Sequence, residues 1–243
     1  MGLVLPVLAV VVGVLVGMVG VGGVLLPPGL VAVGELSANE ATATSTWAFM
    51  FTGVVGTVAY AWRGVVPWSM LARLTIGVVP AAFLGALVNA RLPASVVLLG
   101  LAAITLFVGV HQLRPRTARQ SRDELSTAAL VTVGVFVGFG SALTGTGGPV
   151  LLVPVLLMLG VAPLRAVAVS QAVQLPVVIA GSVGYLQTGL TDIRLGTVLG
   201  ALAGLGVVAG AVVATRIQAD GLRRIIAVAC IGAGIFLVVR AAI

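Results

Sequence analysis

Two short stretches decide the fold: residues 19–29 read VGVGGVLLPPG, and residues 144–154 read TGTGGPVLLVP. Each has a glycine cluster followed by an apolar run and proline, and each lies within sequence that is almost wholly apolar. A glycine inside a helix costs roughly 1 kcal/mol relative to alanine, so an unbroken helix would gain nothing from such clusters. We therefore predict that both clusters interrupt helices.

The composition is that of a membrane protein. Of the 243 residues, 60% are hydrophobic and 8% are charged, whereas a soluble domain has about 25% charged residues. Ala, Val, Leu and Gly supply most of the apolar content, and small residues let transmembrane helices approach closely. We predict an all-α polytopic protein that lies in the lipid bilayer of the bacterial cytoplasmic (inner) membrane.

The charged residues give no indication of a soluble partner or of catalysis. All thirteen cationic residues are arginines, spread over the connections between apolar segments. They are therefore interpreted as topology signals, and no nucleic-acid binding is predicted. The single histidine, His111, lies beside a polar stretch and has no matching nucleophile motif, although an intramembrane hydrolase would need a nucleophile and base within reach of each other. We predict no enzymatic activity, no metal and no cofactor.

One polar stretch, residues 112–126, separates two apolar halves, residues 1–111 and 127–243. A shift of 125 residues aligns the halves without a gap, and it places Tyr60 on Tyr185, the only two tyrosines. The shift also superimposes the glycine clusters and pairs Ser45 with Ser170, Gly56 with Gly181 and Arg91 with Arg216. We predict an internal duplication in which 112–126 is a cytoplasmic linker between two transmembrane repeats.

The glycine segments determine how the halves face. If residues 3–33 cross the membrane once, each half has four spans and the halves are parallel. If they form a re-entrant hairpin, each half has three full spans and the halves are inverted. With the linker in the cytoplasm, the inverted arrangement places ten of the thirteen arginines inside, against eight for the parallel one. The positive-inside rule favours inverted repeats, each a broken or re-entrant hairpin plus three transmembrane helices; the parallel arrangement is the alternative.

A substrate site is predicted where the two breaks meet. Transporters with inverted repeats have broken helices near the bilayer midplane, whose N-termini point at anionic groups, because free N–H groups and the helix dipole favour negative charge. Polar residues also recur at helical spacing after each cluster. Glutamines there are costly unless paired, whereas hydroxyls can bond to their own backbone. The predicted anion-binding residues are Gly22, Gly23, Ser45, Thr46, Thr146, Gly147, Gly148, Ser170, Gln171 and Gln174.

Two further sets of residues are predicted to have structural roles. Aromatic residues at span ends are typical membrane-interface anchors, and this prediction covers Tyr60, Trp62, Trp68 and Tyr185. Glycines four residues apart are typical of close helix contacts, as in Gly13/Gly17, Gly200/Gly204 and Gly206/Gly210. These glycine pairs are therefore predicted to pack helices together and not to bind substrate.

Taken in order, the motifs resemble those of the TauE/SafE sulfite exporter family. The first half has GVGGVLLPPG, ATATS and RGVVPW, and the second has GTGGPVLLVP, AVAVSQ and TGLTDI. The resemblance covers nearly the whole chain. It implies a secondary transporter (permease) that moves a small sulfur-containing anion, such as sulfite, thiosulfate or an organosulfonate, by alternating access. An anion channel and a non-transporting subunit of a larger membrane complex are the alternatives, and a homo-oligomer is left open.

Overall fold

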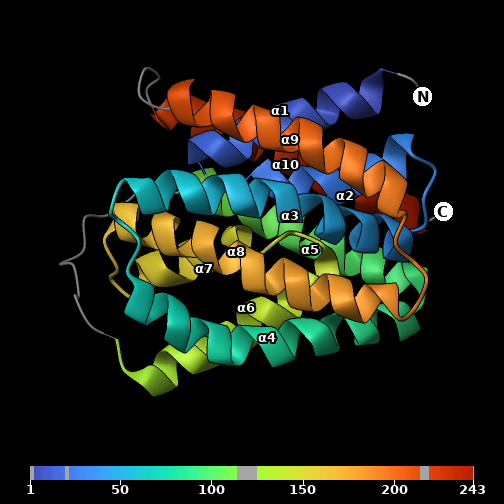
Figure 1. Ribbon diagram of the computed structural model, residues 1–243. Helices are drawn as coiled ribbons and strands as arrows, with labels where there is room; N and C mark the ends of the chain where they lie inside the picture. Colours follow the sequence, from blue (N-terminus) through green and yellow to red (C-terminus); the bar gives the residue numbers. More distant parts are fainter. Residues whose placement is uncertain (1–2, 20–21, 114–124, 214–218, 243) are drawn as a thin grey trace.

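The computed structural model describes residues 3–19, 22–113, 125–213 and 219–242, and every regular element in them is helical (Figure 1). The first half contains α1 (Val4–Val19), the 3₁₀ turn η1 (Gly22–Leu25), α2 (Leu26–Val33), α3 (Ala38–Trp62), α4 (Trp68–Arg91) and α5 (Ala94–Leu113). The second half contains α6 (Thr127–Thr144), α7 (Pro149–Met158), α8 (Pro163–Leu186), α9 (Ile193–Val213) and α10 (Ala219–Ala242).

Helix length and composition confirm a polytopic all-α membrane protein. Within the described residues, five helices are long and apolar enough to cross a membrane; they belong to α4, α5, α6, α8 and α9. Helix α3 is also long, with 25 residues, but it carries buried hydroxyl groups along much of its length. Helices α2 and α7 have only 8 and 10 residues, too few for the roughly 20 that a full span needs.

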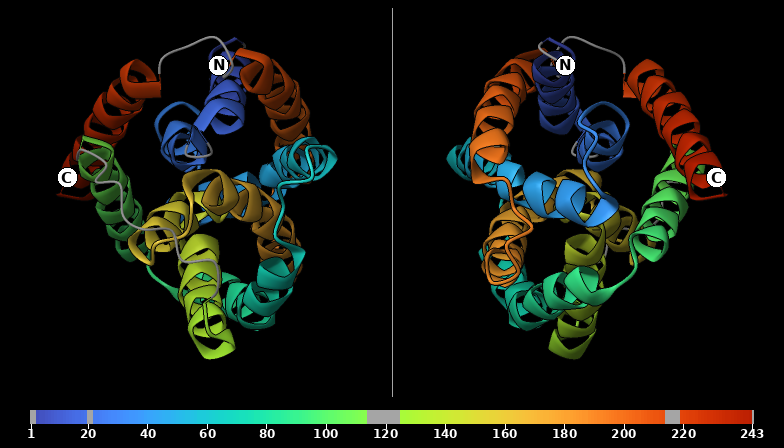
Figure 2. Two further views of the ribbon diagram at one scale, coloured as in Figure 1. Left: turned by 90° about the vertical axis from the view of Figure 1, so that its left-hand side faces the viewer. Right: turned by 90° about the vertical axis from the view of Figure 1, so that its right-hand side faces the viewer.

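The two halves repeat the same order of helices. A shift of 125 residues places α1 on α6, α2 on α7, α3 on α8, α4 on α9 and α5 on α10. The packing repeats too, because α1 packs along α9 and its counterpart α6 packs along α4. Viewed along the helices, α3 and α8 lie side by side across the middle of the molecule (Figure 2). Each half thus packs its first helix on the other half, and α3 and α8 form the central contact.

Helices α3 and α8 run in opposite directions. Gly64, just after α3, lines a pocket of about 460 Å³ together with Arg165 in the first turn of α8. At the other end, the N–H of Asp192, which follows α8, donates to Oγ1 of Thr44 in the second turn of α3 (3.1 Å). The colours in Figure 1 likewise run in opposite directions along the two helices. Inverted repeats require this geometry; which side of the membrane each end faces stays a prediction.

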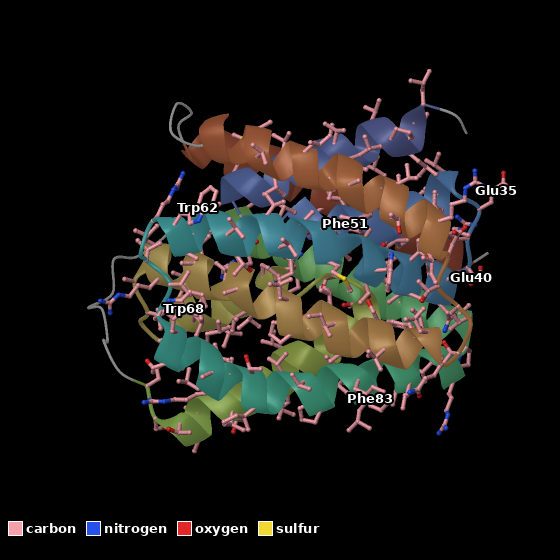
Figure 3. All side chains as sticks on the ribbon, viewed as in Figure 1. Glu35, Glu40, Phe51, Trp62, Trp68 and Phe83 are labelled. Carbon is pink, nitrogen blue, oxygen red and sulfur yellow. The ribbon has the colours of Figure 1, made fainter. Side chains whose placement is uncertain are left out.

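The described charged side chains are divided unequally between the two ends of the helices. The end marked by Trp62 and Trp68 in Figure 3 carries Arg63, Arg73, Arg165 and Arg224, and no acidic side chain that the structure places. The end marked by Glu35 and Glu40 also carries Asp192, Arg91, Arg194 and Arg240. The positive-inside rule predicts that the first end is cytoplasmic. Most of the linker, residues 114–124, and Arg216 lie outside the described residues.

Glycines bring α1 and α9 into backbone contact. A Cβ atom on Gly13 would lie 2.0 Å from the carbonyl oxygen of Ala203, and one on Gly206 would lie 2.4 Å from that of Val10. Helices α6 and α4 repeat this contact through Gly134. Helices in lipid associate by this kind of close packing, since burial of apolar surface provides little driving force there. The predicted packing role of Gly13 and Gly206 is confirmed.

Replacing Gly13 with alanine should lower the thermal stability of the protein. The new Cβ would overlap the backbone of α9, and overpacking of this kind costs about 1–3 kcal/mol. The measurement is the midpoint of thermal unfolding in detergent. Gly100→Ala is the matched control, because a Cβ on this helical glycine meets nothing within 4 Å. Equal losses in the two variants would contradict the packing role.

Candidate functional site

Both glycine clusters interrupt helices, as predicted. In the first half, α1 ends at Val19, and the next element is the η1 turn, which begins at Gly22 and leads into α2. In the second half, α6 is capped by Gly145, with a left-handed φ of 64°, and α7 starts after Gly148, with φ 101°. Gly147 between them has φ 79°. Side-chain-bearing residues rarely adopt such φ values, which explains why glycines form the second break.

The two breaks meet in the interior of the protein. A Cβ atom on Gly23 would lie 3.2 Å from the carbonyl oxygen of Thr146, so there is little room for a side chain between them. Gly23, Thr146, Gly147 and Gly148 are all buried. The structure thus brings together residues that are far apart in the sequence and that the duplication relates to each other.

Hydrogen bonds hold the end of α6 in place. The last four carbonyl groups of a helix have no donor within the helix, and three of those in α6 find one outside it. Ser141 accepts from the N–H groups of Gly145 and Thr146, Ala142 from the Tyr185 hydroxyl, and Leu143 from Nδ2 of Asn89. These bonds fix the position of the break relative to α4 and α8.

The start of α7, by contrast, has N–H groups without a hydrogen-bond acceptor in the described part of the chain. The N–H of Leu152 donates to the carbonyl oxygen of Gly148, and Pro149 has no N–H to offer. The N–H groups of Gly147, Gly148 and Val150 have no acceptor among the residues that the structure describes. Free N–H groups at the positive end of a helix dipole favour a negative ligand. This end of α7 therefore has the chemistry of an anion site.

Gln174 of α8 lies against the second break. Its Nε2 atom donates to Oγ1 of Thr52 (2.8 Å) and to the carbonyl oxygen of Phe49 (3.3 Å). The same atom would lie 3.4 Å from a Cβ on Gly147. Gln174 therefore links the middle of α3 to the glycine break by an amide group, which can both donate and accept hydrogen bonds.

Gln171, one turn earlier on α8, lies against the first break. Its Nε2 donates to the carbonyl oxygen of Val16 (3.2 Å), which belongs to the last turn of α1 and has no donor within that helix. Its side chain also packs on Gly56 of α3. The duplication repeats this contact, since the counterpart Thr46 packs its methyl group on Gly181. Gln171 thus has a structural role at the break in addition to any role in binding.

Several buried side-chain oxygen atoms have no hydrogen-bond partner within the described part of the chain. Four belong to predicted site residues and are Ser45 Oγ, Ser170 Oγ, Gln171 Oε1 and Gln174 Oε1. None of these four residues is more than 2% exposed. An unpaired buried polar atom costs about 1–3 kcal/mol, and a polar ligand or water that met these atoms would offset that cost.

Two predicted site residues point elsewhere. A Cβ on Gly22 would lie 2.4 Å from Cβ of Leu15, so Gly22 packs against α1. The Thr46 hydroxyl donates to the carbonyl oxygen of Thr42 in its own helix (2.8 Å), the local bonding that hydroxyls in helices often adopt. Among the other predicted residues, Gln174 lies beside the second break.

Among the residues near the breaks, sequence reasoning missed Asn89 and left Phe49 and Thr52 out of the predicted site. Asn89 is the only amide side chain in α4, and it is fully buried, with its Nδ2 atom donating to the carbonyl oxygen of Leu143 at the end of α6. Its cost in an apolar setting was the signal that could have marked it. Spacings of three and four residues place Phe49 and Thr52 on one helical face with Ser45 and Thr46, but only the packing of α3 on α8 brings them beside the breaks.

The prediction that Tyr185 is an interface anchor is wrong. Tyr185 is fully buried, and its hydroxyl donates to Ala142 in the last turn of α6. A tyrosine can be buried when its hydroxyl finds a partner, and the broken helix supplies one. Trp62 and Trp68 are exposed at one end of the helices, as an anchor requires. Tyr60 is half-buried there, with the Arg63 guanidinium carbon 5.8 Å from its ring centre.

Replacing Tyr185 with phenylalanine should destabilise the protein by about 1–3 kcal/mol, because the buried carbonyl of Ala142 loses its donor. The ring itself is retained, so packing changes little. The measurement is again the thermal unfolding midpoint in detergent. Tyr60→Phe is the matched control at the duplicated position, since no hydrogen bond of its hydroxyl is seen within the described residues. A midpoint unchanged in Tyr185→Phe would show that the bond adds nothing to stability.

Comparisons with known proteins identify the family. The family model described as sulfite exporter TauE/SafE matches residues 4–237. A probable membrane transporter protein of Xylella fastidiosa (strain 9a5c) is 26% identical over 241 residues, which cover 94% of this chain and 92% of the relative. The probable membrane transporter protein YdhB of Bacillus subtilis (strain 168) is 25% identical over 209 residues, covering 79% and 84%. No solved structure matches the chain. This chain therefore belongs to the sulfite exporter TauE/SafE family and is a multi-pass membrane transporter.

Proposed function

We propose that the protein is a secondary transporter that binds a small sulfur-containing anion between the two helix breaks and carries it across the membrane by alternating access. One observation carries the proposal: free N–H donors at the start of α7 coincide with unpaired polar atoms of the neighbouring α8 in one buried region. Such a region is complementary to a small polar ligand with several oxygen atoms.

The donors of this site are neutral. All of the arginines that the structure places lie toward the two ends of the helices, away from the breaks. A hydrogen bond from an ionised donor is roughly twice as strong as one between neutral groups. A carrier has to release its cargo, so peptide N–H groups and a helix dipole suit transport better than a buried guanidinium.

The mixture of donors and acceptors favours a monoprotonated oxyanion such as hydrogen sulfite. The N–H groups of Gly147, Gly148 and Val150 would bind its charged oxygens. An unpaired amide oxygen, Oε1 of Gln174 or Gln171, would accept a hydrogen bond from the protonated group of the anion. A fully deprotonated anion leaves these amide oxygens unpaired, and their cost then remains.

Alternating access fits the central helices. The predicted site residues are all buried, so the structure shows a state in which they are shielded from solvent. Helices α3 and α8 run in opposite directions and are related by the duplication. Rocking one repeat against the other opens such a site to one side at a time.

A flux assay with purified protein in proteoliposomes tests the proposal. Labelled sulfite, thiosulfate, sulfoacetate (an anionic organosulfonate) and sulfate would be compared, with and without a pH gradient. We expect saturable, counter-flow-sensitive flux of at least one of the first three above protein-free liposomes, and faster sulfite flux at the lower pH, where more of it is protonated. Flux that does not saturate would indicate a channel, and no flux of any of the four anions would overturn the proposal.

A further inference from the structure

Phe49 of α3 lies between the two helix breaks. Its Cζ atom is 3.2 Å from the position of a Cβ on Gly23, and its Cδ2 atom is 2.9 Å from the position of a Cβ on Gly147. Opposite sides of one ring thus contact the two breaks. The ring is fully buried. Phe51, two residues later, instead lines an outward-facing apolar groove with residues of α9 such as Val208 (Figure 3).

The ring fills space that a ligand of both breaks would need. An N–H group binds an oxyanion oxygen at about 2.9 Å, and ring carbons already lie within 3.2 Å of where a Cβ on Gly23 or on Gly147 would be. A phenyl ring has no oxygen or nitrogen atom to accept a hydrogen bond, so it leaves the N–H groups of Gly147 and Gly148 unpaired. The ring and an anion that touches both breaks cannot occupy this place at the same time.

The duplication makes this position asymmetric. The counterpart of Phe49 under the 125-residue shift is Gln174, and Gln174 Nε2 donates to the carbonyl oxygen of Phe49 itself. One half thus contributes an apolar ring at the crossing of α3 and α8, and the other contributes an amide. Two rings would exclude a polar ligand altogether. With one ring and one amide, the site is closed when the ring occupies it and lined by the amide when the ring has moved away.

We propose that Phe49 is the gate of the transport site. In this structure its ring closes the space between the two breaks, and it has to withdraw before an anion binds there. The inference rests on the proposed function for the nature of the ligand. It goes beyond that function by assigning the closing step to one side chain. The contact that opens is the one between the ring and the glycines, and the amide of Gln174 becomes available to the ligand.

Thiol accessibility tests the gate directly. Cys230 is the only cysteine in the chain, so Cys230→Ala gives a thiol-free background into which Thr146→Cys places one thiol at the second break. The probes are an anionic reagent, sulfonatoethyl methanethiosulfonate, and its cationic trimethylammonium analogue. Labelling rates would be compared in the Phe49→Ala, Phe49→Leu and Phe51→Ala variants, with Phe51→Ala as the matched control on the same helix.

We expect the thiol to label slowly when Phe49 is present and about tenfold faster or more in Phe49→Ala, because the rate follows the population of the open site. Phe49→Leu should give an intermediate rate, and it carries the test if Phe49→Ala does not yield folded protein. Phe51→Ala should label at the original rate. The gate is overturned if the folded Phe49 variants label no faster than the Phe51→Ala control.

The two reagents separate the gate from the proposed function. If both label faster without the ring but the cationic one gains as much as the anionic one, Phe49 is a gate and the anion preference is wrong. If sulfite flux is saturable but labelling does not depend on Phe49, the proposed transport function is supported and the gating role of Phe49 is wrong.

Discussion

Replacing Gln174 with leucine should lower the rate of sulfite flux about tenfold or more while leaving the protein folded. Loss of a single hydrogen bond to a charged ligand costs about 1.5–3 kcal/mol, or roughly tenfold or more in rate, and Gln174 is the side chain whose amide lies beside the second break. Leucine has a similar volume. The two atoms that accept from the Gln174 amide remain hydrogen-bonded to each other, because the Thr52 hydroxyl still donates to the carbonyl oxygen of Phe49 (3.1 Å).

The measurement is the initial rate of sulfite flux in proteoliposomes, with elution volume and thermal midpoint recorded for the same preparation. Gln187→Leu is the matched control, since Gln187 is an exposed glutamine at the end of the same helix. Saturable flux at the original rate in Gln174→Leu would remove this residue from the site. Gln171→Leu is a less selective test, because it also leaves the carbonyl oxygen of Val16 in α1 without its donor.

Replacing Gly147 with alanine should stop transport. Gly147 has φ 79°, a conformation that costs other residues about 1–2 kcal/mol. The added Cβ would lie 2.9 Å from Cδ2 of Phe49, so either the ring or the break must move. Both the N–H groups at the start of α7 and the ring are part of the proposed site, and a shift of either one misaligns it.

Gly189→Ala separates strain from crowding in this experiment. Gly189 has a similar φ of 70°, but a Cβ there meets nothing within 4 Å. Alanine at position 189 therefore has a similar conformational cost, but in a loop far from the breaks. Sulfite flux and thermal midpoint are measured for both variants. A similar loss of flux in Gly189→Ala would mean that backbone strain alone, and not the contact with Phe49, explains the result.

The helix breaks could be predicted from the sequence because their cause is local. Glycines in a row disfavour a helix whatever surrounds them, and a proline after the second cluster suits the first turn of a new helix. The structure begins η1 within the first cluster, at Gly22, and α7 directly after the second cluster, at Pro149. The order of the five helices in each half follows the duplicated sequence for the same reason, since equal segments adopt equal local structure.

The composition of the site could be predicted only in part. Gln171 and Gln174 stood out because amides are expensive in an apolar helix. Gln171 donates to the last turn of α1 at the first break, and Gln174 donates to α3 beside the second break. Tyr185 was placed at an interface because aromatic residues near span ends usually lie there. Its real partner, Ala142, belongs to α6, and nothing in the local sequence of α8 indicates which orphan carbonyl will lie within reach.

The sequence by itself determined that this protein lies in a membrane, that it is duplicated and where its helices break. These are properties of composition, of alignment between halves and of glycine, and none depends on long-range contacts. Only the tertiary structure decided that Phe49 lies between Gly23 and Gly147, and which polar atoms remain unpaired. That outcome depends on how α3 crosses α8, and a contact between segments more than a hundred residues apart leaves no trace in the periodicity of either helix.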